Sequence, residues 1–139
     1  RSCLVGSEMC IRDRISAGEI DYVNAHGTST QMNDRSECAA LKAVFGDRVN
    51  DVSVSSTKSC MGHLIAAAGA VEAAVCCLAI RDSTAPVNAN HQNPDPNCDV
   101  NLVIGESRAL EIRAALSNSL GFGGSNSSLV FLNPERGQL

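Results

Sequence analysis

Apolar and polar positions in the first half of the chain follow two regular periods. Residues 20–25 and 52–55 alternate apolar and polar side chains, which predicts two short strands. Between these strands, apolar side chains recur at helical spacing and stop at Gly46, where we expect a helix to end.

The start of this first helix is predicted from its polar residues. Asn33 or Asp34 is the expected N-cap, because short polar side chains accept hydrogen bonds from the first free backbone N–H groups. Glu37 lies three residues after Asp34 and would complete a capping box.

A long apolar segment dominates the middle of the chain. Residues 62–80 are apolar almost all round, which predicts a helix buried on most of its sides. A membrane span needs about 20 apolar residues, and Glu72 stands in the middle of this segment, so we expect a core helix and no membrane insertion.

The last third of the chain predicts strands joined by irregular connections. Residues 84–96 hold all but one of the four prolines and predict an irregular connection, and residues 102–104 predict a weak strand. Residues 114–119 and 127–132 predict two strands of a hairpin-like pair joined by a glycine-rich turn. The resulting order, β-α-β-α-β-β, indicates an α/β fold.

Composition narrows the class of protein. The chain has 139 residues, 44% of them hydrophobic and 19% charged, as expected for a globular domain with a core. The net charge of −4 argues against nucleic-acid binding, because domains that bind nucleic acids usually carry a basic surface. The seven cysteines are an odd number without paired metal spacing, so we expect a reduced, cytoplasmic protein and no disulfide framework.

Residues 1–14 fit neither period. Their sequence looks like the translation of a sequencing-adapter read, so we expect a non-native leader at 1–14 and a single domain at 15–139. A divergent natural leader is the alternative interpretation.

Three turns rich in glycine and hydroxyl side chains carry the candidate chemistry. His26 lies in the turn after the first predicted strand, and His63 closes the run at 56–63 after the second. The third turn, at 120–126, joins the two C-terminal strands. Polar turns of this kind, each flanked by apolar segments, predict one active site built from several loops.

These turns together resemble the β-ketoacyl-acyl carrier protein synthases, most closely the elongating type of bacterial fatty-acid synthesis. The resemblance rests on three motifs and covers roughly residues 20–132: His26-Gly27-Thr28-Ser29-Thr30, Ser56-Thr57-Lys58 with Gly62-His63, and Gly121-Phe122-Gly123-Gly124. It implies an α/β fold that is the C-terminal half of a thiolase-like fold, with a mixed five-stranded sheet.

The resemblance implies an acyltransferase that performs a decarboxylative Claisen condensation of an acyl thioester with malonyl carrier protein. His26 and His63 match the family pair that stabilises the enolate oxygen, and Lys58 matches a catalytic or site-organising lysine that forms a polar network with Glu72. A structural ion pair is the alternative role for these last two residues.

The remaining family positions concern the substrate arm and the acyl pocket. Thr28 and Thr30 match residues that bind the phosphopantetheine amides, and the Phe122 N–H completes the oxyanion hole while its ring gates the acyl pocket. Asn126 is expected to brace this loop. His91 matches no catalytic position, and we expect it in a surface turn.

The resemblance also sets expectations for partners and limits. It implies acyl carrier protein as partner, a homodimer, and neither a metal nor a redox cofactor. The family's nucleophilic cysteine motif is not in this chain, so we expect the chain alone to be inactive. The alternatives are a polyketide ketosynthase, a non-catalytic chain-length partner subunit, and a metal site formed by Cys60 with His26 and His63.

Overall fold

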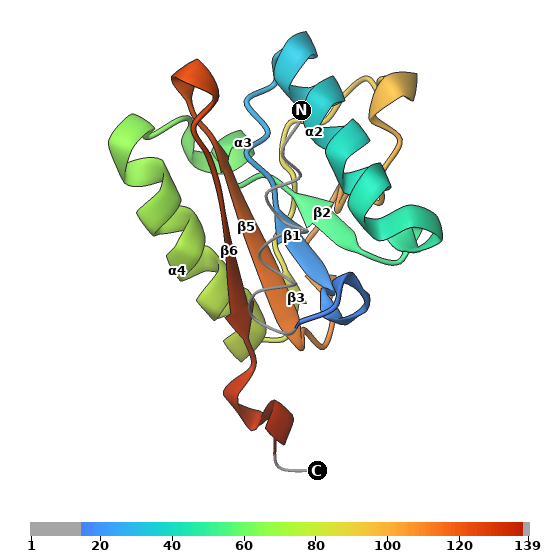
Figure 1. The fold of residues 1–139 in the computed structure, drawn as a ribbon, viewed down its shortest axis with the longest axis vertical. Coiled ribbons are helices and arrows are strands. Elements are labelled where there is room, and N and C mark those ends of the chain that lie inside the picture. The colour runs from blue at the N-terminus through green and yellow to red at the C-terminus, as the bar shows by residue number, and fades with distance from the viewer. Residues whose placement is uncertain (1–14, 138–139) are drawn as a thin grey trace.

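A four-stranded mixed sheet forms the centre of the computed structural model, which describes residues 15–137; the predicted leader at 1–14 lies outside the described residues. The strand order is β2-β1-β5-β6 (Figure 1). The strands are β1 (Tyr22–Asn24), β2 (Ser53–Ser55), β5 (Ala114–Leu120) and β6 (Asn126–Leu132). Strand β1 pairs in parallel with both β2 and β5, and β5 pairs antiparallel with β6. The two early strands and the C-terminal hairpin are thus confirmed.

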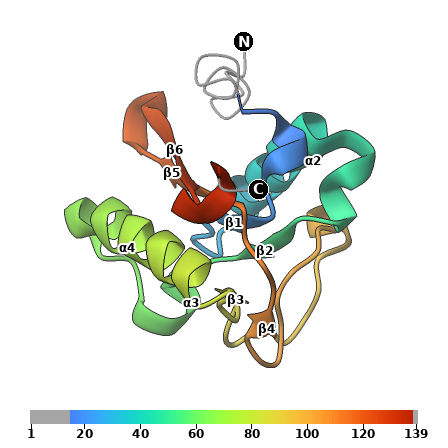
Figure 2. The ribbon, with the colours of Figure 1, turned by 90° about the horizontal axis from the view of Figure 1, so that it is seen from below.

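Two helices cover opposite faces of this sheet (Figure 2). Leu41 of α2 (Gln31–Phe45) packs in a core cluster with Val23 of β1. Cys76 of α4 (Ala68–Arg81) packs in a second cluster with Tyr22. Neighbouring residues of a strand point to opposite faces, so the two helices lie on different sides of β1. Both faces being covered explains why every residue of β1 and β2 is buried.

The fold class is confirmed as mixed α/β. Of the five strands expected, four are full strands of the main sheet. Residues 102–104 contribute a single parallel bridge, between Leu102 and Val54 at the β2 edge. A separate small sheet pairs β3 (Thr84–Ala85) with β4 (Arg108–Ala109), which the sequence pattern did not predict.

The predicted N-cap of the first helix was wrong. Helix α2 begins at Gln31 with Thr30 as its N-cap residue, so Asn33 and Asp34 lie inside the first turn. Glu37 therefore forms no capping box and is buried against the loop that carries His26. The helix ends at Gly46, as predicted.

The predicted helix over 62–80 is also shorter and more exposed than expected. Helix α3 (Lys58–Met61) ends at Gly62, the 3₁₀ turn η3 (Ile65–Ala67) follows, and α4 starts only at Ala68. The buried residues of α4 recur every three or four positions on one face and end in an adjacent pair: Ala68, Glu72, Cys76, Ala79 and Ile80. The opposite face is open, with Leu78 exposed.

The other elements are short. They are η1 (Ala17–Glu19), η2 (Gly46–Asn50), η4 (Pro96–Cys98), η5 (Phe122–Gly124) and η6 (Pro134–Gly137). No helix among the described residues is long and apolar enough to cross a membrane.

Candidate active site

The three predicted turns meet at one edge of the sheet. His26 follows the end of β1, Lys58 follows the end of β2, and Phe122 follows the end of β5. These three strands run parallel, so their carboxyl ends share an edge, where α/β folds place their ligand sites. The start of α4 lies at the same edge, since a Cβ placed on Gly69 would lie 3.5 Å from the Ser119 Oγ at the end of β5.

His26 and His63 come together edge to face. Their ring centroids lie 5.4 Å apart and the ring planes are inclined by 85°. His26 is buried, whereas His63 is exposed at the mouth of the site. The backbone N–H of Ile65 donates to the Nδ1 of His63 at 3.1 Å. A ring that accepts at Nδ1 is neutral and carries its proton on Nε2, which is then a free donor.

His26 is also neutral at physiological pH. Burial lowers the pKa of His26 to about 4, and the nearby Lys58 and His63 act in the same direction. Its Nδ1 is buried without a hydrogen-bond partner among the described residues. The two imidazoles are therefore uncharged rings whose N–H groups can donate to a ligand without transferring a proton.

Glu37 holds the His26 turn in place. Its Oε1 accepts the backbone N–H of His26 at 2.9 Å, and its Oε2 accepts that of Gly27 at 3.0 Å. The side chain of Asn118 on β5 donates to the same carboxylate, and the Ser128 hydroxyl on β6 donates to Asn118 at 2.7 Å. Burial raises the pKa of Glu37, and these hydrogen bonds oppose the rise. The carboxylate thus ties the first turn to the hairpin.

The first and second turns are packed directly against one another. The Ser56 hydroxyl donates to the Gly27 carbonyl at 3.2 Å, and a Cβ on Gly27 would come within 2.5 Å of the Ser56 Cβ. Gly27 also has a φ of +43°, so a larger residue is disfavoured on both counts. Fully buried Asn24 adds hydrogen bonds to Thr57 across the same junction.

Lys58 and Glu72 form a buried ion pair beneath the histidines. The ammonium group of Lys58 donates to the Oε1 of Glu72, and both side chains are at least nine-tenths buried. The Oε2 of Glu72 has no hydrogen-bond partner among the described residues. This pair joins α3 to α4, so it fixes the two ends of the segment that carries His63.

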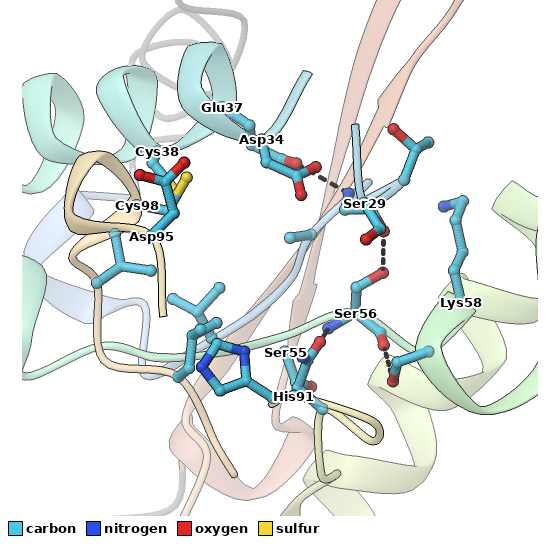
Figure 3. Close-up of a pocket in the computed structure, with 18 of the residues that line it drawn as sticks. Ser29, Asp34, Glu37, Cys38, Ser55, Ser56, Lys58, His91, Asp95 and Cys98 are labelled. Carbon is cyan, nitrogen blue, oxygen red and sulfur yellow. Dashed lines mark hydrogen bonds between the residues drawn. The ribbon is translucent and has the colours of Figure 1, made fainter. Parts of the chain in front are cut away.

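Thr28 and Thr30 line a large open cleft beside this site. The cleft has a volume of about 1270 Å³ and lies between the His26 turn, α2 and the segment around η4 (Figure 3). The two threonine hydroxyls hydrogen bond to each other at 3.0 Å. Lys58 and His63 also line the cleft, and His91 lies on its wall.

Phe122 and Asn126 lie farther along the hairpin. Phe122 is fully exposed in η5, and Asn126 is exposed where β6 begins, opposite Leu120. Neither residue lines the cleft of Figure 3. Both residues therefore lie on the hairpin that begins at this edge of the sheet, outside the cleft that His63 lines.

The residues that sequence reasoning missed are the polar side chains that brace the turns. Glu37, Asn24 and Asn118 carry no glycine or hydroxyl motif, and the spacing of Glu37 favoured a helix cap instead. Within residues 15–137 no three histidine, cysteine or acidic side chains are placed to hold a metal ion.

Comparison with known proteins identifies the family of this chain. Residues 5–92 match the family model described as the β-ketoacyl synthase, C-terminal domain. The chain is 50% identical over 116 residues to 3-oxoacyl-[acyl-carrier-protein] synthase 2 of Coxiella burnetii, covering 84% of this chain and 28% of that protein. It is 45% identical over 123 residues to a putative polyketide β-ketoacyl synthase 1 of Streptomyces halstedii, covering 88% and 29%.

A solved structure has the same fold as this chain, the C-terminal half of the thiolase-like fold. A type II polyketide ketosynthase in complex with its acyl-carrier protein superposes with a TM-score of 0.86 at 36% identity, covering 90% of this chain and 31% of that one. The chain thus spans less than a third of the length of these relatives. It belongs to the β-ketoacyl synthase family of acyltransferases, where it corresponds to the C-terminal domain.

Proposed function

We propose that the protein carrying this chain elongates an acyl thioester with a malonyl group delivered by acyl carrier protein, with loss of CO₂. The observation that carries the proposal is the edge-to-face meeting of two neutral imidazoles, His26 and His63, of which His63 lines the cleft.

The demanding step is the breaking of the carbon–carbon bond to the malonyl carboxylate. Its electron pair moves onto the malonyl thioester, whose carbonyl oxygen becomes an enolate oxygen as CO₂ departs. The N–H groups of His26 and His63 donate to this oxygen. Donors fixed before the reaction stabilise developing charge without reorganising, which makes them effective in a site that excludes water.

Neutrality suits the two rings to this task. The pKa of His26 at about 4 keeps its ring uncharged, and the Ile65 N–H directs the proton of His63 to Nε2. A charged imidazolium would instead pair with the malonyl carboxylate and stabilise the ground state, which does not raise the rate of the chemical step.

Lys58 supports the pair through its charge and its contact with Glu72. It lies near enough to His26 to lower the pKa of that ring, so it helps to keep the donor neutral. Its ion pair with Glu72 holds α3 and α4 together on either side of His63. We assign these two residues an organising role in catalysis.

We assign the binding of the phosphopantetheine arm and of the acyl chain to residues of the surrounding turns. Thr28 and Thr30 line the cleft, and we assign their hydroxyls to binding of the phosphopantetheine amides. Phe122 in its exposed turn is assigned to the oxyanion hole and the acyl gate, with Asn126 as brace of the hairpin. The carbanion then attacks an acyl group held on a cysteine outside the part of the relatives that this chain spans.

Several broader assignments follow from the family. We assign the protein to fatty-acid elongation as a homodimer, with acyl carrier protein as partner and no metal or redox cofactor. The five free cysteines within residues 15–137 support a reducing, cytoplasmic location. A polyketide ketosynthase is the second candidate, favoured by the similarity to the Streptomyces halstedii protein. A non-catalytic chain-length subunit is disfavoured, because such a subunit has no electrostatic reason to keep two converging histidines and Lys58.

The test uses the full-length protein that contains this chain. Its substrates are malonyl carrier protein and, as primer, a saturated acyl group attached to acyl carrier protein. We expect CO₂ release and a product extended by two carbons. His63→Ala should abolish CO₂ release, whereas Glu106→Ala, in an exposed loop that does not line the cleft, should release CO₂ at the wild-type rate. Products carrying several keto groups would move the assignment to polyketide synthesis, and unimpaired decarboxylation by His63→Ala would refute the role of the pair.

A further inference from the structure

Two cysteines from distant parts of the chain meet on one wall of the cleft. Cys38 lies in the middle of α2, and Cys98 ends η4, sixty positions later in the sequence. Figure 3 shows their side chains next to each other, and Cys98 is one of the neighbours that raise the pKa of Cys38. Both side chains line the cleft that holds Thr28 and Thr30.

The two elements are already held together without a covalent bond. Helix α2 and η4 pack against each other, and the Nε of Arg35 lies 3.1 Å from the Oδ2 of Asp95. Asp95 in turn accepts the Asn97 N–H at the start of η4, which fixes the backbone that leads into Cys98. A bond between the two sulfur atoms would therefore join surfaces that are in contact in the reduced protein.

We propose that Cys38 and Cys98 form a reversible disulfide that bridges α2 and η4 beside the active-site cleft. The oxidant is a low-molecular-weight disulfide such as oxidised glutathione. This inference does not depend on the proposed condensation, because it rests only on the placement of two thiols.

Differences in exposure set the order of the two steps. Cys98 is half-buried, whereas Cys38 is buried. The Cys98 sulfur attacks glutathione disulfide, its proton goes to the departing glutathione, and a mixed disulfide remains on Cys98. The Cys38 sulfur then displaces the second glutathione, which takes the proton of Cys38. Two thiols are oxidised and one glutathione disulfide is reduced to two glutathione molecules.

The second step should be slow at neutral pH. Burial, followed by the neighbouring Cys98, raises the pKa of Cys38 to about 12, so little thiolate is present at pH 7. Below that pKa the thiolate fraction grows about tenfold for each pH unit, and ring closure should accelerate accordingly.

Neighbouring groups place this bond close to the site. Cys38 is the residue after Glu37, whose carboxylate holds the turn that carries His26. Glu37 and Asp34 of α2 both raise the pKa of Cys38, and Asp95 and Asp99 flank η4, which ends at Cys98. The disulfide would thus fix the segment around η4 to the same helix that organises the His26 turn.

Peptide mapping tests the proposal on the full-length protein. The protein is incubated with oxidised glutathione, alkylated, and digested with trypsin. Cleavage yields residues 36–42 and 82–108, each with a single cysteine, so a link between these peptides identifies the bond without ambiguity. We expect that link in protein from the monomer band of a non-reducing gel, so that the bond lies within one chain. Dithiothreitol should remove the link, and the link should form faster at pH 8 than at pH 7.

Variants separate the bond from general thiol oxidation. Cys38→Ser should leave glutathione attached to the 82–108 peptide, and Cys98→Ser should leave residues 36–42 unlinked. Cys77→Ser is the matched control, because Cys77 is an exposed cysteine of α4, and it should preserve the link. Wild-type protein that carries glutathione on Cys98 without any link to residues 36–42 would overturn the proposal.

Discussion

Glu37 shows how much of the site depends on one buried carboxylate. Both of its oxygens accept backbone N–H groups of the His26 turn, and Asn118 donates to it from β5. A carboxylate accepts at both oxygens, whereas an amide offers one acceptor and one donor group. The exchange of Glu37 for Gln therefore leaves one backbone donor facing another donor.

We expect Glu37→Gln to destabilise the protein by about 1–3 kcal/mol, the cost of leaving a buried group without its partner. The displaced His26 turn should also slow CO₂ release. Urea unfolding and a decarboxylation assay measure the two effects. Glu106→Gln in an exposed loop is the control and should change neither. Wild-type stability and a wild-type rate of CO₂ release in Glu37→Gln would show that the Glu37 carboxylate does not hold the His26 turn in place.

The protonation of His26 predicts a pH dependence of stability. The pKa of this ring is about 4 in the folded protein and 6.5 in an unfolded chain. Its contribution to stability is therefore complete above pH 6.5 and is lost as the pH falls through 4, because the unfolded state takes up the proton first.

Full-length protein should accordingly lose up to about 1.4 kcal/mol of stability per pH unit through this one group between pH 6.5 and 4. His26→Gln removes the titration, so the difference between the two urea midpoints should narrow as the pH falls across this window. A difference that stays constant with pH would show that His26 is protonated equally in both states.

At the scale of elements, the segment between β2 and α4 determines where His63 lies. Gly62 has a φ of +78° and ends α3, and the following turn holds the His63 ring through the Ile65 N–H. Ile65 itself has a φ of +52°, which is unusual for a β-branched residue and marks a backbone held by its surroundings.

This segment also shows why part of the site was not predictable. Residues 62–80 are rich in alanine and other aliphatic side chains, so helix propensity alone favours one continuous helix. The break before Ala68 follows Gly62 and coincides with the contact of His63 with His26 and the ion pair of Lys58 with Glu72, two long-range contacts that a local pattern does not contain. The strands and the glycine-rich turns were predictable because periodicity and turn chemistry are local.

The Lys58–Glu72 pair allows stability and activity to be separated. Glu72→Gln leaves the buried ammonium of Lys58 without a countercharge, and we expect a loss of about 3–5 kcal/mol in the free energy of unfolding. The double variant Lys58→Met with Glu72→Leu removes both charges and should recover most of that stability, because apolar replacements of a buried pair are often neutral.

Decarboxylation should remain impaired in this double variant despite its recovered stability, since Lys58 is assigned an organising role beside His26. Urea unfolding and CO₂ release are measured on the same preparations. Full recovery of both would reduce the pair to a structural contact.

At the scale of the whole molecule, the sheet order explains why three separated motifs lie at one edge of the sheet. The parallel strands β1, β2 and β5 bring their carboxyl ends to one edge, and the two covering helices bury both faces of the sheet (Figures 1 and 2). The sequence pattern predicted the element order, but the strand order and the braces of Glu37 and Asn118 depend on contacts between distant segments. The motif residues could therefore be predicted, whereas their supports could not.

Several leucines are exposed on neighbouring elements, as expected if further parts of a longer protein cover them. Leu78 on α4 and Leu129 and Leu132 on β6 are exposed on elements that contact each other. The relatives are more than three times as long as the stretch that matches this chain. Activity measurements therefore belong on the full-length protein.

The rate of CO₂ release from malonyl carrier protein by the full-length protein tests the central claim most directly. His26→Ala and His63→Ala are compared with the wild type, and loading of the acyl primer onto the nucleophile is followed in parallel to show that each variant is folded. Removal of one fixed donor to a developing oxyanion typically lowers the rate about 10²–10³-fold. The account predicts a loss of that size in both variants with primer loading retained; undiminished CO₂ release in either variant would contradict it.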